Sequence, residues 1–244
     1  MEPIRRPVRI GFLVPSGNPT VEVEMIALAP PKVSVHFTRM VAQGAVGAHE
    51  GLLERTRTQI AHIAQNAALL AMVKPKVIVM AHTAMSATLG AEAEAELAAR
   101  MEREHGVPFI TAFGSVLAAL AHLGAKRVAL GTPYDADSTA RTRAYLEAAG
   151  IEVVSEGRLE GVTNIYDETA ARARELAQAV DVPTAQAVFL SGLGMPTIAT
   201  LEAMERDLGK PVVSAASAMM WNALRVAGEP APLEGFGRLL AERR

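Results

Sequence analysis

One histidine stands where a parallel sheet would expose a reactive side chain. His82 comes just after the apolar run 77–80, which is typical of a buried strand. An imidazole at the end of such a strand can titrate near neutrality and act as an acid or a base. It can equally cap the following helix or bind a backbone carbonyl. Position alone leaves both roles open, and we predict His82 as a catalytic residue.

Tyr134 offers a second chemical group, because it follows Thr132-Pro133 at the end of another predicted strand. A phenol at this place can donate a hydrogen bond to an oxyanion. The alternative is that the ring only packs in the turn. We predict Tyr134 as the second catalytic residue.

Four loops at the ends of predicted strands are rich in small residues and hydroxyl groups. Parallel α/β sheets bind ligands at the carboxyl ends of their strands, and free backbone N–H groups there attract anions. No Lys or Arg lies in these loops, so the pattern predicts a carboxylate held by neutral donors rather than a polyphosphate. The loops are residues 15–20, 81–86, 132–135 and 191–197.

Two asparagines near these loops also have structural alternatives. Asn18 lies in Ser-Gly-Asn-Pro, which is a strong turn signal. Asn164 can cap a helix predicted over 167–180. Both side chains therefore remain candidates for binding and for local structure.

Several kinds of chemistry are excluded by what the sequence lacks. The chain has no cysteine, and its 6 histidines form no HxH or HxxxH pair, so we predict no disulfide, thiol nucleophile or metal site. There is no Walker A motif and no GxSxG elbow, and Gly192-Leu193-Gly194 is too short for a dinucleotide fingerprint. We therefore expect no nucleotide-binding or serine-hydrolase site of these types.

The charge balance limits the partners. The 244 residues include 24 Lys and Arg against 26 Asp and Glu, which argues against a nucleic-acid binder. No run of 18 apolar residues predicts a membrane span, and no signal peptide is evident. We expect a cytoplasmic protein that binds a small carboxylate. An Ala/Met-rich helical stretch at 216–220 is compatible with the homo-oligomer that we also expect.

Short β-branched runs alternate with longer Ala- and Leu-rich runs along the whole chain. Continuous apolar strands suit a parallel sheet that is covered on both faces, so the fold class is α/β. The predicted strands are 8–14, 33–37, 77–80, 108–111, 127–130, 151–154, 187–190 and 211–214. The predicted helices are 50–73, 91–104, 113–123, 138–149, 167–180, 197–208 and 216–227.

An internal repeat predicts two pseudo-symmetric lobes. The stretch Met-Glu-Arg-x-x-Gly-x-Pro occurs at 101–108 and again at 204–211, each time between a helix and a short strand. Each glycine can take the left-handed conformation that ends a helix. We expect each lobe to be a parallel sheet flanked by helices. If the C-terminal helix returns to the first lobe, lobe 1 is 1–110 plus 217–244, and lobe 2 is 111–216.

Taken together, these motifs resemble the Asp/Glu racemase superfamily, and within it the maleate isomerase and arylmalonate decarboxylase branch. The similarity spans nearly the whole chain and keeps the order of the motifs. The matching pieces are residues 10–22, 131–134, Asn164 and 191–196.

The resemblance implies a cofactor-independent enzyme whose two lobes enclose a small carboxylic or dicarboxylic acid. It implies that Ser16, Asn18, Tyr134 and Asn164 hold the carboxylates of the substrate. Thr83, Ser191, Gly192 and Leu193 complete the predicted binding site, in which hydroxyl groups and backbone amides stabilise an enediolate.

The chain departs from this branch at both positions where the family has its reactive cysteines. His82 stands in Ala-His-Thr where the isomerases resemble Ala-Cys-Thr, and Gly192 takes the second cysteine position. Thiolate addition to a double bond and proton exchange between two thiols are therefore excluded.

Two interpretations follow from this departure. The first is a decarboxylase, isomerase or lyase in which His82 replaces the thiol as acid or base. The alternative is a non-catalytic carboxylate-binding member of the fold that has lost both thiols, and a divergent variant with replaced cysteines remains a third possibility.

Overall fold

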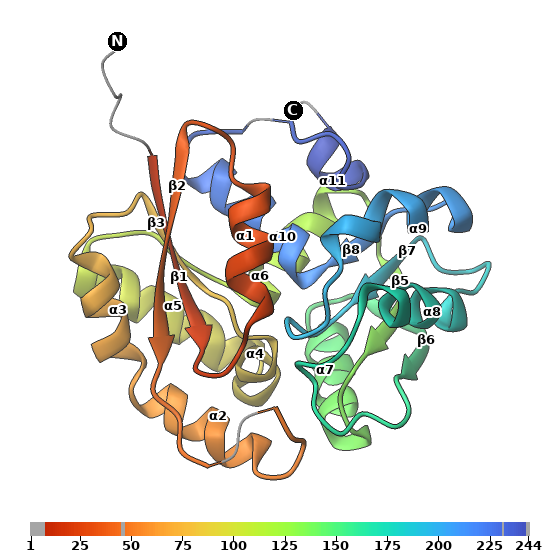
Figure 1. Cartoon of the computed structure of the whole chain (residues 1–244), viewed down its shortest axis with the longest axis horizontal. Helices are drawn as coiled ribbons and strands as arrows, with labels where there is room; N and C mark the ends of the chain where they lie inside the picture. The colour runs from red at the N-terminus through yellow and green to blue at the C-terminus, as the bar shows by residue number, and fades with distance from the viewer. Residues whose placement is uncertain (1–7, 45–46, 231, 243–244) are drawn as a thin grey trace.

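The computed structural model describes residues 8–44, 47–230 and 232–242. It contains two four-stranded parallel sheets with strand orders β2-β1-β3-β4 and β6-β5-β7-β8. Figure 1 shows the two sheets in separate lobes that lie side by side, with helix α1 between them. The second order repeats the first with every number raised by four, so the predicted α/β fold with two similar lobes is confirmed.

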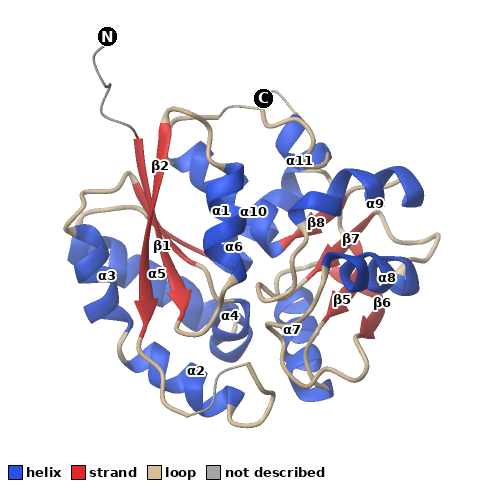
Figure 2. Ribbon diagram, in the orientation of Figure 1, coloured by secondary structure: helices blue, strands red, loops and turns tan. Residues whose placement is uncertain are grey.

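The first sheet has helices on both faces (Figure 2). Ile10, Phe12 and Val14 pack with residues of α1, and the intervening Leu13 packs with residues of α3 and α5 on the opposite face. This double burial explains why the strands read as continuous apolar runs. The elements are β1 (Val8–Pro15), α1 (Thr20–Leu28), β2 (Val33–Met40), α2 (Leu52–Ala61), α3 (Ile63–Ala71), β3 (Val77–Met80), α4 (Thr83–Leu89), α5 (Ala91–His105), β4 (Phe109–Thr111) and α6 (Ala112–His122).

The second sheet repeats this succession of elements, and α8 contacts β5, β6 and β7. The elements are β5 (Arg127–Thr132), α7 (Ala136–Ala148), β6 (Glu152–Arg158), α8 (Ala170–Val180), β7 (Ala187–Leu190), a single turn of 3-10 helix at Ile198–Thr200, α9 (Leu201–Leu208), β8 (Val212–Ser214), α10 (Ala215–Val226) and α11 (Arg238–Ala241). Among the described residues, no helix is long and apolar enough to cross a membrane.

All eight predicted strands occur, and the helices differ more. The segment predicted as one helix over 50–73 is two, because His62 leaves the helical conformation with φ −102° and ψ 6°. Helices α1, α4 and α11 were not predicted. They have 9, 7 and 4 residues, too few turns for a helical period to stand out.

The repeated Met-Glu-Arg stretch ends a helix in the same way in both lobes. Gly106 ends α5 with φ +63°, and Gly209 ends α9 with φ +67°. Each glycine N–H donates to the carbonyl four residues earlier, that of Glu102 or Glu205. The left-handed helix ends expected from the repeat are therefore confirmed.

Helices α6 and α10, which follow the last strands of the two sheets, pack against each other, and α10 also contacts α1 and β3 of the first lobe. Helix α10 also contacts β8 of the second sheet, so the return of the C-terminal helix to lobe 1 stays a prediction. The boundaries at 110/111 and 216/217 themselves remain a prediction.

Candidate functional site

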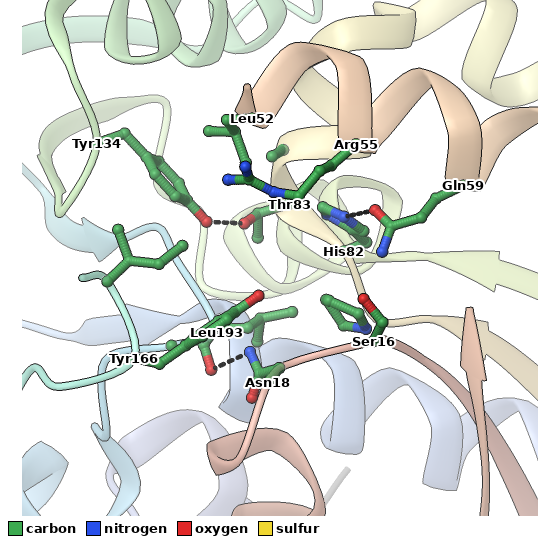
Figure 3. Close-up of a pocket in the computed structure, with 14 residues that line it drawn as sticks. Ser16, Asn18, Leu52, Arg55, Gln59, His82, Thr83, Tyr134, Tyr166 and Leu193 are labelled. Carbon is green, nitrogen blue, oxygen red and sulfur yellow. Dashed lines mark hydrogen bonds between the residues drawn. The ribbon is translucent and has the colours of Figure 1, made fainter. Parts of the chain in front are cut away.

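A pocket lies where the two lobes meet, at the carboxyl ends of β1, β3, β5 and β7 (Figure 3). In each sheet the first and third strands in chain order are neighbours, and the chain leaves them toward opposite sides of the sheet. Ligands bind at such switch points. The cavity volume is about 30 Å³. Its walls are Pro15, Ser16, Asn18, Leu52, Arg55, Gln59, His82, Thr83, Ala84, Tyr134, Ile165, Tyr166, Leu193 and Gly194.

Asn18 connects the pocket wall of lobe 1 to lobe 2. Its Oδ1 accepts hydrogen bonds from the N–H groups of Thr20 and Val21 at the start of α1, at 2.8 and 3.0 Å. Its Nδ2 donates to the carbonyl of Leu193 at 3.0 Å. The turn-forming role is thus confirmed, and the second N–H of the amide remains for a ligand.

The loop that carries Ser16 and Asn18 is braced from β2. Arg39 donates to the carbonyls of Ser16 and Asn18 at 3.0 and 3.1 Å, and it pairs with Glu22 at 2.5 Å. The backbone of the loop is therefore held in place before any ligand arrives.

His82 precedes α4 at the floor of the pocket and is 6% exposed. Its Nδ1 accepts the N–H of Met85 at 3.2 Å, which confirms the predicted helix cap. Its Nε2 lies 2.7 Å from Oε1 of Gln59. Burial, and then the charge of Arg55, lower the pKa of His82 to about 4, so the ring is neutral at pH 7.

Tyr134 enters the pocket from the lobe opposite His82. Its hydroxyl lies 2.9 Å from Oγ1 of Thr83, the first residue of α4. Burial raises the pKa of Tyr134 to about 12. The phenol therefore keeps its proton at neutral pH and can donate a hydrogen bond to an oxyanion.

Three important pocket residues were not predicted from the sequence. Arg55 and Gln59 lie one turn apart on α2, and Tyr166 follows β6. Arg55 is 5% exposed and donates to the carbonyls of Glu50, at 2.6 Å, and Ala48. The four loops contain no Lys or Arg, but the pocket is not lined by neutral donors alone, because α2 outside these loops adds the Arg55 guanidinium.

A sequence signal for α2 existed. Leu52, Arg55, Thr56 and Gln59 follow the spacing i, i+3, i+4, i+7, which places them on one helical face. Three of the four are polar, and the structure buries all three. Two of these three buried polar residues, Arg55 and Gln59, line the pocket.

Not all of the predicted residues reach the pocket. Ser16, Asn18, His82, Thr83, Tyr134 and Leu193 line it, whereas Ser191, Gly192 and Asn164 do not. Ser191 is fully buried. Asn164 accepts the N–H of Tyr166 at 3.0 Å. The helix that Asn164 was expected to cap is capped by Thr169 instead.

Gly192 borders the site in a conformation that favours glycine. Its φ is +103°, and a Cβ there would lie 2.7 Å from Cγ and Cδ of Pro133 and 3.6 Å from the Tyr134 hydroxyl. A side chain at position 192 would therefore point at the loop that carries Tyr134, and the Pro133 ring already fills that space.

The electrostatics favour an anion. No Asp or Glu is among the residues that line the pocket, and no ion pair neutralises Arg55 within the described part of the chain. A buried guanidinium without a counter-charge is costly, and its planar donors match a carboxylate. The arrangement is therefore suited to binding a small carboxylate.

The family model for arylmalonate decarboxylase matches residues 10–240. The chain belongs to the arylmalonate decarboxylase family. It is 33% identical to a maleate isomerase of Nocardia farcinica over 96% of both chains. It is 35% identical to an arylmalonate decarboxylase of Bordetella bronchiseptica over 68% of this chain and 71% of the relative.

Solved structures of this family agree with the fold. The maleate isomerase of Pseudomonas putida S16, crystallised with maleate as a cysteine-to-alanine variant, superposes with a TM-score of 0.87 at 26% identity, covering 96% of this chain and 97% of that one. A Nocardia farcinica maleate cis-trans isomerase variant holds a covalently bound succinylcysteine intermediate; its TM-score is 0.85 at 27% identity, covering 97% of this chain and 99% of that one. Such an intermediate requires a thiol, and this family member has no cysteine.

Proposed function

We propose that the protein is a cofactor-independent enzyme of the decarboxylase, isomerase or lyase type that acts on a small carboxylic or dicarboxylic acid. The observation that carries the proposal is the buried Arg55 guanidinium, which lines the pocket and pairs with no carboxylate among the described residues. The family membership supports the same class of reaction, because the named relatives are a maleate isomerase and an arylmalonate decarboxylase.

One carboxylate of the substrate pairs with Arg55 in this proposal. Two of the five N–H donors of the guanidinium bind carbonyls of the segment before α2, and the others remain available. Asn18 and the hydroxyl of Ser16, on the opposite wall, hold the second polar group of the substrate.

The reacting carbon lies near Tyr134 and Thr83. Loss of CO₂ or of a proton next to a carboxylate leaves an enediolate-like intermediate, whose charge sits on oxygen. One hydroxyl of the Tyr134–Thr83 pair donates to the other, and the remaining O–H of the pair donates a hydrogen bond to this oxyanion from a buried site, where such bonds are strong. Because burial raises the pKa of Tyr134 to about 12, the phenol remains a donor throughout the neutral range.

The acid or base role of His82 stays a prediction. Both ring nitrogens are occupied by protein hydrogen bonds, and these bonds favour a positioning role instead. A homo-oligomeric state and a cytoplasmic location also stay predictions.

The test combines turnover and binding. Purified protein is incubated with malonates, maleate, β-hydroxy acids and hydantoins, and products are followed by proton NMR. We expect Arg55→Gln to weaken binding of the active acid by about 10- to 100-fold, since a hydrogen bond to a charged group contributes about 1.5–3 kcal/mol. Arg57→Gln removes an exposed arginine of the same helix and serves as the control. Equal effects of the two variants would refute the role of Arg55.

A second candidate function is carboxylate binding without turnover. The observation that favours it is the absence of both thiols from a family in which one relative forms a succinylcysteine intermediate. Calorimetry separates the two candidates, because tight diacid binding with no product supports the binding protein. Absence of both binding and turnover over the whole panel would refute the proposed function and this alternative together.

A further inference from the structure

The direction of the hydrogen bonds around His82 is set by a single backbone group. The Met85 N–H can only donate, so Nδ1 of His82 must accept and carries no proton. A neutral ring then carries its proton on Nε2. That nitrogen faces Oε1 of Gln59 at 2.7 Å and donates to it. The start of α4 therefore selects the tautomer of His82.

The surroundings keep this ring neutral. His82 is 6% exposed, and the Arg55 guanidinium on α2 disfavours a second positive charge nearby. The other titratable groups that line the pocket are Tyr134 and Tyr166, and burial raises the pKa of both phenols, so neither supplies a negative charge. His82 is thus a neutral Nε2–H donor over the neutral pH range.

A fixed ring fixes the amide of Gln59 in turn. Because Oε1 accepts from His82, the NH₂ group of Gln59 must turn away from the imidazole. Figure 3 shows Gln59 with its nitrogen on the side of Ser16. Gln59 is 3% exposed and lines the pocket, and within the described residues no hydrogen bond occupies that NH₂ group.

We propose that Gln59 is a substrate-binding residue that donates its amide N–H groups to the carboxylate or enediolate oxygen, and that His82 is the positioning residue that fixes this orientation. The identity of the ligand as a small carboxylate rests on the proposed function. Arg55 lies four residues earlier on α2, so both residues present donors from one face of the helix. Helix α2 therefore presents only hydrogen-bond donors to a negatively charged ligand. His82 binds Oε1 of Gln59, so this acceptor does not face the ligand.

Imidazole NMR tests this relay, in which the Met85 N–H fixes the tautomer of His82 and His82 orients the Gln59 amide. The test needs no substrate. Protein labelled with ¹⁵N-histidine is examined by long-range proton–nitrogen correlation, with the His82 signals assigned from a His82→Gln variant. We expect a neutral Nε2–H ring with no titration between pH 8 and pH 5. An Nδ1–H tautomer, or a titration midpoint above pH 6, would overturn the relay.

Binding tests the donor role of Gln59. Calorimetry with malonate and maleate compares the native protein with Gln59→Glu, which replaces the donor by acceptors. We expect binding to weaken by about 10- to 100-fold, and we expect the new carboxylate to raise the titration midpoint of His82 into the neutral range. Gln65→Glu places the same change on the exposed side of the neighbouring helix α3 and should leave both readouts unchanged.

A second variant guards against misfolding. Gln59→Met keeps the length of the side chain without adding charge, and it should weaken diacid binding while leaving the thermal midpoint within a few degrees. Unchanged binding in both Gln59 variants would overturn the donor role. If the native protein binds neither diacid and neither binds nor turns over any other acid of the panel, the proposed function fails on its own, and the tautomer measurement still decides the relay.

Discussion

The position that the family resemblance assigns to the second thiol is the place where restoring a cysteine is expected to fail. Gly192 has φ +103°, and a Cβ there would lie 2.7 Å from two ring carbons of Pro133, whereas carbon atoms prefer about 3.5–4.0 Å. A non-glycine residue in a left-handed conformation costs about 1–2 kcal/mol, and overpacking adds about 1–3 kcal/mol. We therefore expect Gly192→Cys to lower the free energy of unfolding by about 2–5 kcal/mol.

The assay is thermal and urea unfolding of matched variants. For a chain of this size, about 1 kcal/mol corresponds to roughly 2–4 °C in Tm, so Gly192→Cys should lose about 4–20 °C. Gly192→Ala and Gly209→Ala make the same change at two glycines with positive φ, but at Gly209 no described atom beyond the chain neighbours lies within 4 Å of such a Cβ. The difference between these alanine variants measures the clash. A loss below about 1 kcal/mol in Gly192→Cys, or equal losses in the alanine pair, would refute the reasoning.

Two further predictions follow from buried polar groups. Tyr134→Phe keeps the ring but removes the hydroxyl that meets Thr83 at 2.9 Å; we expect turnover to fall about 10²- to 10³-fold, and unchanged turnover in a steady-state assay would exclude the oxyanion role. Burial raises the pKa of Glu24, whose Oε1 accepts the N–H groups of Thr197 and Ile198. The folded state then holds a proton that the unfolded state has already released, so stability is lost as the pH rises toward the raised pKa. Urea unfolding at about pH 5 and pH 8 should show a smaller loss for Glu24→Gln than for the native protein, and equal losses would contradict this assignment.

The sheets were predictable because their signal is local. Four-residue apolar runs such as 77–80 and 187–190 lie between helices, and burial on both faces makes them continuous. The short helices α1 and α4 were not predictable in the same way, since their ends are made by capping contacts rather than by a long period. In α4 the cap is the side chain of His82, which the sequence presents equally as a catalytic group.

The site residues that directly follow a strand were predictable, because parallel sheets bind ligands at the carboxyl ends of their strands. The site residues on a helix were not. Ser16, His82 and Tyr134 follow β1, β3 and β5, and the structure brings them to one pocket. Arg55 and Gln59 sit on a helix, and only the three-dimensional packing shows which face of α2 meets the pocket. The sequence therefore indicated a neutral site, whereas the guanidinium of Arg55 makes the pocket cationic.

The contacts that join the first turns of α1 to residues 193–198 also constrain motion. Asn18 binds Leu193, Thr20 donates to the carbonyl of Gly194, and Glu24 binds the N–H of Thr197. Three successive hydrogen bonds join the lobes at this edge, so we expect any opening of the pocket to occur at the α2 edge, where Leu52 and Arg55 form the wall. The cavity of about 30 Å³ is small for a diacid, so we expect a diacid to displace side chains of that edge when it binds. We therefore expect changes in α2 to alter the rates of ligand capture and release, and the backbone amides at the α1 edge to exchange their protons more slowly than those of α2.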